Sequence, residues 1–463
     1  MPKLFGTDGV RGVANTELTP ELALSLGRTG AYVLTKTPEN SEISKISEAP
    51  ETSKTPKILI ATDSRRSGDM LAAALSAGLC SVGAQVCLAG VMPTPAVAYL
   101  VRQAGFDAGA MISASHNPMA DNGIKFFSHT GYKLPDALEE EIEAYMSTPE
   151  KLPRPTGKGV GITVSGDHMA EEYLSYLLST VPGLSLKGLK MALDCANGAT
   201  SDIGPKVFEA LGATVHALSC EPNGCNINEN CGSTHMEALV QFVKTNSMDI
   251  GIAFDGDGDR MLAVDANGEM VDGDQILAII GHDLMEQGRL PNNTIVATSM
   301  SNQGLEVMCR RHGITLHRTD VGDRYVLEKM LADNLTLGGE QSGHVIFSDY
   351  STTGDGILTA LRLVEVIVRK RQPLAQLKTI VEQFPQVLVN VSVANAKKRE
   401  WSKSPEVMHR MAEIEAALAG EGRIMVRPSG TEALVRVMIE GRDQKDIQSK
   451  ADSLADVIRE QLG

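Results

Sequence analysis

An apolar strand that runs into a group of carboxylates is encoded by IGIAFDGDGDR at residues 250–260. Its three acidic side chains, Asp255, Asp257 and Asp259, alternate with glycines, which let the backbone fold tightly enough for the carboxylates to converge. Carboxylate oxygens suit Mg²⁺ or Ca²⁺, and an EF-hand is excluded because its loop needs Gly where Arg260 stands. A solvated acidic turn is the alternative, but three like charges after a buried strand repel one another unless a cation compensates them. We therefore predict a metal site.

The residues around this stretch follow the pattern of an α/β protein. Gly and Pro punctuate short β-branched runs and longer helical ones. Three times a helical run ends in Gly and a short strand follows, at Gly83, Gly212 and Gly313. Gly suits such a helix end because it accepts a positive φ. We therefore predict three similar α/β domains with mixed sheets.

The last part of the chain has a different order of elements. We expect a strand at residues 387–393, a helix that contains Trp401 and residues 408–418, strands near 423–427 and 434–440, and a final helix from Asp443. This order indicates a smaller α+β domain. The four predicted domains span residues 1–155, 156–260, 261–373 and 374–463. Residues 36–57 are rich in Thr, Ser, Glu, Lys and Pro, and we expect a mobile surface insertion there.

Composition excludes several classes of protein. The 463 residues carry 43 basic and 58 acidic side chains, and a formal net charge of -15 argues against nucleic-acid binding, which needs clustered cations. No apolar run reaches the roughly 20 residues of a membrane span, and the first residues have no signal-peptide core, so we expect a cytoplasmic protein. Seven cysteines without a zinc-binding spacing indicate free thiols in a reducing compartment.

A second polar cluster follows an apolar strand at AMISASHNP, residues 110–118. The strand delivers Ser115 into a turn rich in His, Asn and Pro, where its hydroxyl could act as a nucleophile or carry a phosphoryl group. The absence of a Gly-x-Ser-x-Gly elbow weakens a hydrolase interpretation. An ordinary turn is the alternative.

Two later loops offer groups that bind sugars and phosphates. GGEQSGH at residues 338–344 presents a carboxylate, an amide, a hydroxyl and an imidazole, which suit buried sugar hydroxyls. RPSGTE at residues 427–432, with Arg436 beyond it, combines hydroxyls, guanidinium groups and backbone N–H groups at a Gly turn, which suit a phosphate dianion. An ordinary turn is the alternative for each. The sequence has no Walker A loop and no dinucleotide-binding Gly motif.

In this order, one in each predicted domain, the four loops resemble those of the α-D-phosphohexomutase superfamily over essentially the whole chain. FGTDGVRG at residues 5–12 and GEQSGH at residues 339–344 resemble the phosphoglucosamine mutase branch more closely than the phosphomannomutase/phosphoglucomutase branch, which more usually has Met where Gln341 stands. The resemblance implies four domains around a central cleft. It also implies an isomerase that interconverts glucosamine 6-phosphate and glucosamine 1-phosphate through a phosphoserine and a bisphosphorylated sugar, toward UDP-N-acetylglucosamine and peptidoglycan.

The resemblance assigns expected roles residue by residue. Ser115 would carry the phosphoryl group, and its phosphate would bind one Mg²⁺ per subunit together with Asp255, Asp257 and Asp259. Catalytic roles would fall to His116, Lys125, Arg11, Arg260 and His344, with Lys125 or His344 as the main proton carrier. Glu340 and Ser342 would hold the sugar hydroxyls. The phosphate that is not transferred would meet Arg427, Ser429, Gly430, Thr431 and Arg436.

The expected partner is a small sugar phosphate, with neither nucleic acid nor membrane, and a homodimer is left open. A bisphosphorylated hexose or a kinase would first phosphorylate Ser115. Three alternatives stay open: a mutase for mannose or glucose phosphates on the same scaffold, a magnesium-dependent phosphatase, and a non-catalytic sugar-phosphate sensor. The chain departs from the family pattern at Ala433, where relatives commonly have Pro, and in the length of the 36–57 segment.

Overall fold

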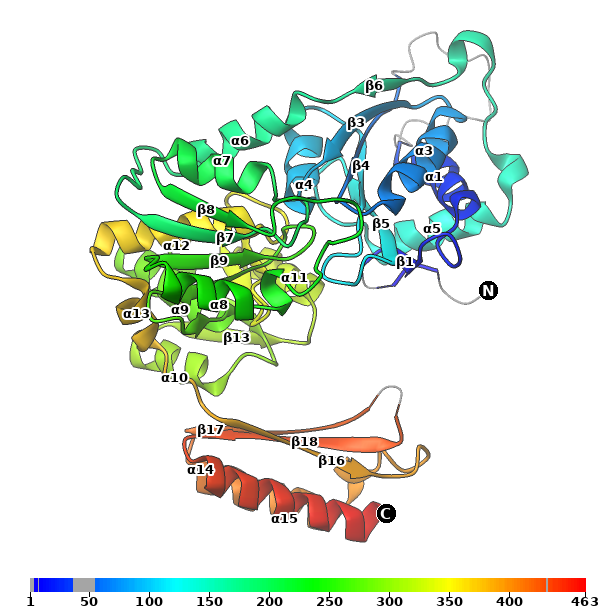
Figure 1. Cartoon of the computed structure of the whole chain (residues 1–463). Coiled ribbons are helices and arrows are strands. Elements are labelled where there is room, and N and C mark those ends of the chain that lie inside the picture. Colours follow the sequence, from blue (N-terminus) through cyan, green and yellow to red (C-terminus); the bar gives the residue numbers. More distant parts are fainter. Residues whose placement is uncertain (1–3, 7, 36–54, 430–431) are drawn as a thin grey trace. The chain divides into compact units, whose positions relative to one another are not determined.

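The computed structural model describes residues 4–6, 8–35, 55–429 and 432–463 (Figure 1). Most of the segment expected to be a mobile insertion, residues 36–54, lies outside the described residues, and its last residue, Lys57, begins a strand. The chain forms two compact units. One comprises Met1–Thr298 and Arg318–Lys378, and the other comprises Ser299–His317 and Thr379–Gly463.

The first sheet of the larger unit is mixed and has the order β1-β5-β4-β2-β3-β6. Its strands are β1 (Val10–Val13), β2 (Lys57–Thr62), β3 (Gln85–Val91), β4 (Ala108–Ile112), β5 (Asp121–Ser128) and β6 (Thr163–Ser165). β2 is parallel to β3 and β4, whereas β5 is antiparallel to β1 and β4. The helices are α1 (Pro20–Leu34), α3 (Ser67–Cys80), α4 (Thr94–Gln103) and α5 (Asp136–Met146).

Alternation along the strands places helices on both faces of this sheet. Ile58 and Ile60 of β2 join the core formed with α1, α3 and α5, whereas the opposite face at Gly109 is covered by α4. α1 and α3 approach closely at two glycines. A Cβ on Gly27 would lie 2.3 Å from the Leu75 carbonyl oxygen, and one on Gly78 would lie 2.2 Å from the Leu24 oxygen. Any larger residue at these positions would push the helices apart.

The second sheet has the order β11-β10-β9-β7-β8 and is also mixed. Its strands are β7 (Lys190–Asp194), β8 (Thr214–Leu218), β9 (Ile250–Phe254), β10 (Met261–Asp265) and β11 (Met270–Val271). β7 is parallel to β8 and β9, and β10 is antiparallel to β9. The accompanying helices are α6 (Met169–Ser179), α7 (Ile203–Ala210) and α8 (Glu237–Thr245), of which α8 packs on the Gly251 face.

The third sheet contains β12 (Thr294–Thr298), β14 (Leu337–Gly339) and β15 (Val345–Phe347). β12 is parallel to β14, and β14 is antiparallel to β15. α11 (Asp323–Asp333) contributes Val326 and Met330 to the core on one face, and α9 (Gly273–Glu286) packs on the other at Ile295. The long α12 (Gly356–Lys370) contacts α9, and the short α13 (Leu374–Leu377) follows it.

Sheet membership shows where the strands lie relative to the predicted domain boundaries. β6 pairs with β3 of the first sheet although it follows residue 155. β10 begins at Met261 and pairs with β9 of the second sheet. β10 follows the loop that carries Asp255, Asp257 and Asp259. It pairs antiparallel with β9 in the same sheet, because the tight loop reverses the direction of the chain. The boundaries at 155, 260 and 373 stay predictions.

The smaller unit contains an antiparallel three-stranded sheet in the order β16-β18-β17. Its elements are β16 (Gln386–Ser392), α14 (Pro405–Leu418), β17 (Gly422–Pro428), β18 (Leu434–Gly441) and α15 (Gln444–Leu462), in agreement with the predicted order. α14 and α15 cover one face and share one core with it (Figure 1). Trp401 was expected within the helix, but it lies in a separate 3₁₀ turn, because Ser404 and Pro405 begin α14.

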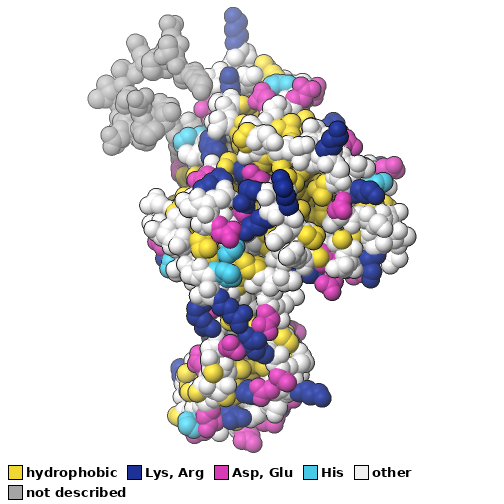
Figure 2. All heavy atoms as spheres, turned by 90° about the vertical axis from the view of Figure 1, so that its left-hand side faces the viewer, with side chains coloured by type: hydrophobic (Ala, Val, Ile, Leu, Met, Phe, Trp, Pro, Cys, Tyr) yellow, Lys and Arg dark blue, Asp and Glu magenta, His cyan; other side chains and the backbone are white. Residues whose placement is uncertain are grey.

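α10 (Gln303–Arg311) also belongs to this unit, and β13 (Thr315–Thr319) begins in it and ends in the larger one. The three predicted helix–Gly–strand junctions are confirmed, since Gly83, Gly212 and Gly313 follow α3, α7 and α10 with φ of 96°, 92° and 71°. The seven cysteines all lie among the described residues, and none of them forms a disulfide. Among the described residues, no helix is both long and apolar enough to cross a bilayer. Basic and acidic side chains intermingle on the face shown in Figure 2.

Candidate active site

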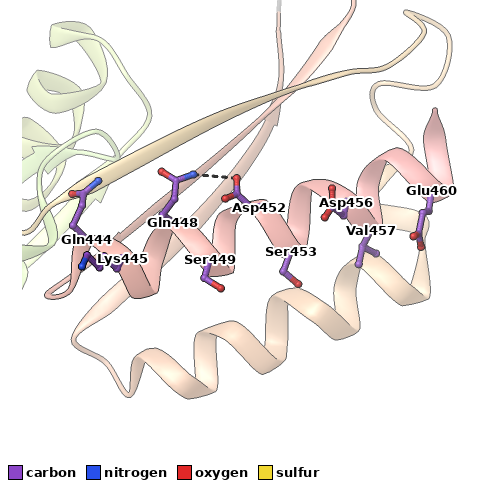
Figure 3. Close-up of a pocket in the computed structure, with 9 residues that line it drawn as sticks. All are labelled: Gln444, Lys445, Gln448, Ser449, Asp452, Ser453, Asp456, Val457 and Glu460. Carbon is purple, nitrogen blue, oxygen red and sulfur yellow. Dashed lines mark hydrogen bonds between the residues drawn. The ribbon is translucent and has the colours of Figure 1, made fainter.

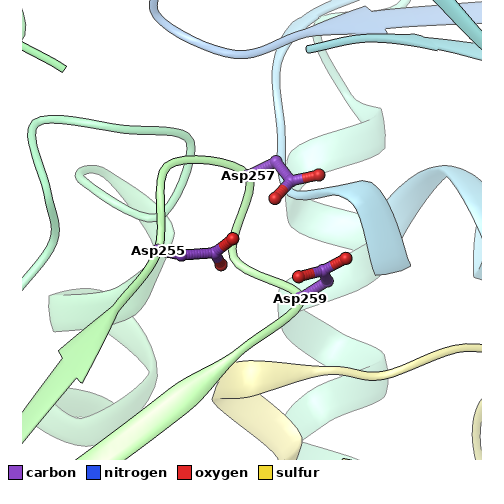
Figure 4. A group of neighbouring side chains, drawn as sticks. All are labelled: Asp255, Asp257 and Asp259. Carbon is purple, nitrogen blue, oxygen red and sulfur yellow. The ribbon is translucent and has the colours of Figure 1, made fainter. Parts of the chain in front are cut away.

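The three carboxylates predicted to bind a metal lie together directly after β9 (Figure 4). Asp255, Asp257 and Asp259 are buried, and one oxygen of each lies within 4.8 Å of the others. One oxygen of Asp257 and one of Asp259 are buried without a hydrogen-bond partner among the described residues. Burial, reinforced by Asp259 and Asp257, raises the pKa of Asp255 well above its usual value. Three buried carboxylates, two of which have an oxygen without a hydrogen-bond partner among the described residues, fit a hard divalent cation.

Ser115 meets this group of carboxylates although it lies 140 residues away in the sequence. It follows β4 in a left-handed conformation with φ of 52°, which is uncommon for a residue with a side chain. Its Oγ donates a hydrogen bond of 2.6 Å to Asp255 Oδ2, and its backbone N–H donates to Ser113 Oγ at 2.9 Å. The hydroxyl therefore lies beside the candidate metal ligands.

Lys125 on β5 is buried between two carboxylates. Its Nζ lies 3.0 Å from Asp257 Oδ2 and 3.0 Å from Asp8 Oδ2. Burial disfavours the ammonium charge, but Asp257 and Asp8 outweigh burial and raise the pKa of Lys125. Lys125 is therefore a fixed cation beside the carboxylates at neutral pH, which suits neutralisation of phosphate oxygens better than acceptance of a proton.

The other basic residues predicted for this region lie around the same loop. His116 Nδ1 is 3.4 Å from Ser115 Oγ, and burial, together with Arg260 and Arg11, lowers the pKa of His116. The backbone N–H of Arg260 donates to Asp255 Oδ1 at 3.1 Å, and its Nε lies 3.8 Å from Asp259 Oδ1. Arg11 forms an ion pair with Asp8. Cations thus surround the group of carboxylates.

His344 lies in the loop between β14 and β15 and is fully buried. Its Nε2 accepts a hydrogen bond of 3.0 Å from the Gly354 backbone N–H, so a ring proton would reside on Nδ1. Nδ1 lies 3.6 Å from Asp259 Oδ2. Burial works against the imidazolium, but Asp259 and Asp323 raise the pKa of His344. The ring is therefore tied to the carboxylates through Asp259.

The predicted sugar-binding residues share this loop. Ser342 Oγ donates to Glu340 Oε2 at 3.3 Å. Burial alone would lower the pKa of Arg260 and of His344. Nearby carboxylates outweigh burial and raise both pKa values; Asp259 has the largest effect, and Glu340 adds a smaller one. Gln341 points elsewhere, because its Nε2 donates to Asp272 Oδ2, at the start of α9, at 3.1 Å.

The predicted phosphate loop lies in the smaller unit. Arg427 and Arg436 are register partners on β17 and β18. Ser429 is buried, and its Oγ accepts the Glu432 backbone N–H at 3.1 Å. Lys398, which the sequence did not single out, donates to the Ser429 carbonyl oxygen at 2.7 Å and so adds a cation to this loop. Gly430 and Thr431 lie outside the described residues.

Several polar residues near Ser115 were not recognised in the sequence. Lys133 Nζ lies 2.7 Å from both Asp8 Oδ1 and Asp323 Oδ2, and Asp323 Oδ2 lies 3.6 Å from His344 Nε2. Lys133 therefore joins carboxylates from the first and third predicted domains. The remaining group consists of Asp63, Arg65, Thr94 and Asn228, which contact Ser115, its neighbours or Asp257.

Two hollows in the surface lie largely outside the predicted site. Within the described part of the chain, the first is lined by none of the predicted site residues, and the second by Lys125 alone among them. A hollow of about 780 Å³ runs along α15 and is lined by polar side chains such as Gln448 and Asp452 (Figure 3). A cavity of about 450 Å³ in the larger unit is lined by Lys125, Lys133 and Asp323 together with apolar residues of α5 and α11. Lys125, the residue that the second shares with the predicted site, contacts Asp257 through its Nζ.

Family models match all four parts of the chain. They are described as phosphoglucomutase/phosphomannomutase α/β/α domains I, II and III, at residues 2–152, 171–268 and 272–384, and as the C-terminal domain at residues 388–457. The chain belongs to this phosphohexomutase family. Its members are isomerases, so the chain is an enzyme with three α/β/α domains and a C-terminal domain.

Curated relatives place the chain within the phosphohexomutases. Proteins named phosphoglucosamine mutase from Acetivibrio thermocellus and Ruminiclostridium cellulolyticum are 53% and 52% identical over the full length of both chains. Among solved phosphohexomutases, a family protein from Burkholderia thailandensis covers 99% of this chain and 97% of its own, with a TM-score of 0.79 and 22% identity. Aspergillus fumigatus N-acetylphosphoglucosamine mutase, solved with GlcNAc-6P and magnesium, covers 84% of this chain and 94% of its own, with a TM-score of 0.60 and 17% identity.

Proposed function

We propose that the protein interconverts glucosamine 6-phosphate and glucosamine 1-phosphate, with Ser115 as the phosphoryl carrier. The observation that carries this proposal is the 2.6 Å hydrogen bond from Ser115 Oγ to Asp255, within a group of three buried carboxylates. The choice of glucosamine is supported by identities above 50% to phosphoglucosamine mutases over the whole chain. The product would enter the route to UDP-N-acetylglucosamine and peptidoglycan.

The reaction is written as two phosphoryl transfers. In the first, the P–O bond to Ser115 Oγ breaks and Oγ takes up a proton, while a P–O bond forms to the free hydroxyl oxygen of the sugar phosphate, whose proton passes to a base. In the second, the Ser115 hydroxyl gives its proton to a base as its Oγ bonds to the phosphoryl group at the other end of the bisphosphate, and the sugar oxygen that this group leaves is protonated. No net oxidation, reduction or hydrolysis occurs.

The three carboxylates and the Ser115 phosphate would hold one Mg²⁺ per subunit, consistent with the unpartnered oxygens of Asp257 and Asp259. When bound, the cation would neutralise charge on the transferred phosphoryl group. Lys125 and Arg260 would stabilise the phosphate oxygens as permanent cations, and Arg11 would extend the positive region. The raised pKa of Lys125 favours His116 or His344 for proton transfer.

The sugar and the phosphate that is not transferred would bind to separate groups of residues. This separation is needed because the bisphosphate must turn over in the site between the two transfers. Glu340 and Ser342 would bind the sugar hydroxyls or the amino group. The phosphate that is not transferred would be held by Arg427, Ser429, Gly430, Thr431 and Arg436, to which we add Lys398. Gln341 would act on specificity through the Asp272 contact that anchors this loop, without touching the sugar.

A comparison of kcat/KM on glucosamine, mannose and glucose phosphates tests the substrate. Glucosamine phosphate should be preferred, and a clear preference for mannose phosphate would favour the phosphomannomutase alternative. Inorganic phosphate appearing as fast as substrate disappears would favour the phosphatase. Ser115→Ala should abolish isomerisation, and Asp257→Asn should remove most magnesium-dependent turnover. Unchanged activity in Ser115→Ala would place the phosphoryl carrier at another site, and a wild-type protein that binds the sugar phosphate without isomerising it would favour the sensor alternative.

The remaining parts of the proposal concern the surroundings of the enzyme. A bisphosphorylated hexose or a kinase would prime Ser115, and intact-mass spectrometry would reveal the added phosphate. We also propose the cytoplasm as the compartment, where sugar phosphates and reduced thiols occur together. A homodimer is a further proposal that light scattering would test.

A further inference from the structure

Two backbone carbonyl oxygens of the Ser115 loop are held by the same pair of side chains. Arg65 Nη2 donates to the carbonyl oxygens of Ser115 and Asn117 at 3.1 Å and 2.6 Å. Asn228 Nδ2 donates to the same two oxygens at 2.9 Å and 3.0 Å. We refer to Arg65 and Asn228 as the carbonyl clamp. The clamp fixes the Ser115–His116 and Asn117–Pro118 peptide groups without using the Ser115 side chain.

The two halves of the clamp come from different sheets. Arg65 follows β2 of the first sheet, is fully buried and forms an ion pair with Asp63, so it belongs to the same layer as Ser115. Asn228 lies beyond β8 of the second sheet, and its backbone N–H donates to the Ala196 carbonyl oxygen at 2.9 Å. Of the two clamp residues, Asn228 is therefore the one that belongs to the sheet bearing the three carboxylates, and it holds the Ser115 loop there in addition to the hydrogen bond from Ser115 Oγ to Asp255.

Asn228 also contacts the loop of carboxylates. Gly256 stands between Asp255 and Asp257, and a Cβ there would lie 2.6 Å from the Ser115 carbonyl oxygen and 2.8 Å from Asn228 Nδ2. The carboxamide is thus packed between the Ser115 carbonyl and Gly256 with no room for a methyl group. A change in the position of Asn228 would change the distance between Ser115 and the carboxylates.

We propose that Asn228 is a positioning residue that keeps Ser115 Oγ beside the carboxylates during the part of the cycle when Ser115 carries no phosphate. This inference rests on the proposed function, in which Ser115 gives up its phosphoryl group and must receive one back. The clamp grips carbonyl oxygens, so its hydrogen bonds persist whichever group Oγ carries. An alignment error of about 1 Å can slow phosphoryl transfer roughly 100-fold. When the loop is held in place, transfer back to Ser115 is therefore fast enough to occur before the bisphosphate dissociates.

Two variants separate the hydrogen bonds from the backbone conformation. Asn228 has a φ of 58°, which Ala would strain, so Asn228→Gly removes the carboxamide while tolerating the backbone. Asn228→Asp keeps the shape but replaces the two donated hydrogen bonds with a repelling oxygen. Asn223→Ala is the matched control, because this exposed side chain in the same segment has one hydrogen bond within the described part of the chain, which it accepts from the Cys225 backbone N–H.

The experiment measures kcat and KM for glucosamine 1-phosphate with and without added glucosamine 1,6-bisphosphate. Both Asn228 variants should lose about 10- to 100-fold in kcat with KM within about threefold, release bisphosphate during turnover, and regain rate when bisphosphate is added. Asn223→Ala should match the wild type.

Three results would overturn the inference: a wild-type kcat in Asn228→Gly, a loss that added bisphosphate leaves unchanged, or an equal loss in Asn223→Ala. If the wild type itself shows no isomerisation, the proposed function fails. If the wild type isomerises and Asn228→Gly equals it, only the positioning role fails.

Discussion

Replacing Asp355 with Asn should change how the stability of the protein depends on pH. Asp355 is fully buried at the start of α12, where its Oδ1 accepts the Leu358 N–H at 2.9 Å and its Oδ2 accepts the Tyr173 hydroxyl at 2.6 Å. Burial, only partly offset by these hydrogen bonds, raises the pKa of Asp355 to about 6 from 3.8. Asn preserves both contacts, since its oxygen can cap the helix and its amide can donate to the tyrosine oxygen.

The folded protein holds the Asp355 proton more tightly than the unfolded chain does. The folded pKa is raised, so the contribution of Asp355 to stability is complete below about pH 4 and is lost as pH rises through about 6. A shift of about 2 pKa units corresponds to about 3 kcal/mol, of which roughly half falls between pH 5 and pH 7.5. Asn stays neutral, so Asp355→Asn should be more stable than the wild type by about 1.5 kcal/mol at pH 5 and about 3 kcal/mol at pH 7.5.

Urea unfolding of both proteins at the two pH values measures this difference. Asp443→Asn is the control, because Asp443 caps α15 in the same way but is exposed, so water solvates its charge in both states. The Asp355→Asn advantage should grow with pH, and the Asp443 pair should show no such growth. An advantage independent of pH, or an Asp355→Asn protein less stable than the wild type at pH 7.5, would refute the argument that burial of the charge is costly.

The buried cation Lys133 and the cysteine thiols give two further predictions. Lys133→Met should lower the free energy of unfolding by about 3 kcal/mol, because it removes the ammonium 2.7 Å from the Asp323 carboxylate and one of the cations around Asp8, and Lys133→Arg should restore part of it. An unchanged thermal midpoint in Lys133→Met would contradict this. Iodoacetamide at pH 8 should label exposed Cys225 before buried Cys231, because burial raises the pKa of Cys231 to about 11. Peptide mass spectrometry checks the order, and early labelling of Cys231 would contradict it.

The carboxylates and Ser115 could be placed from the sequence because each follows a short apolar strand. β9 ends at Phe254 and β4 at Ile112, and polar residues that follow such strands collect at the ends of α/β sheets. The same reasoning would have found Asp63 and Arg65, which come directly after the apolar run of β2. They were missed although charged residues and a glycine do follow β2, in DSRRSGD at residues 63–69.

Other contacts had no local signal in the sequence. Asn228 contacts Ser115 and Lys133 contacts Asp323, both more than 100 residues away, and each of these contacts depends on how two separately formed sheets are placed. Gln341 was read from the family pattern as a mark of glucosamine specificity, but its side chain contacts Asp272 at the start of α9. A motif identifies the loop, whereas the direction of each side chain depends on what packs beside it.

The balance of charge around the three carboxylates explains why a cation would bind beside Ser115. Asp257 has the Lys125 ammonium at 3.0 Å, which after the opposing effect of burial lowers the pKa of Asp257. Asp259 lies within 4 Å of both Arg260 and His344. Among the described residues no basic side chain forms an ion pair with Asp255, whose Oδ2 instead accepts the Ser115 hydroxyl. The least compensated negative charge is therefore the one that faces Ser115, so a divalent cation gains most by binding where it also touches the phosphoryl carrier.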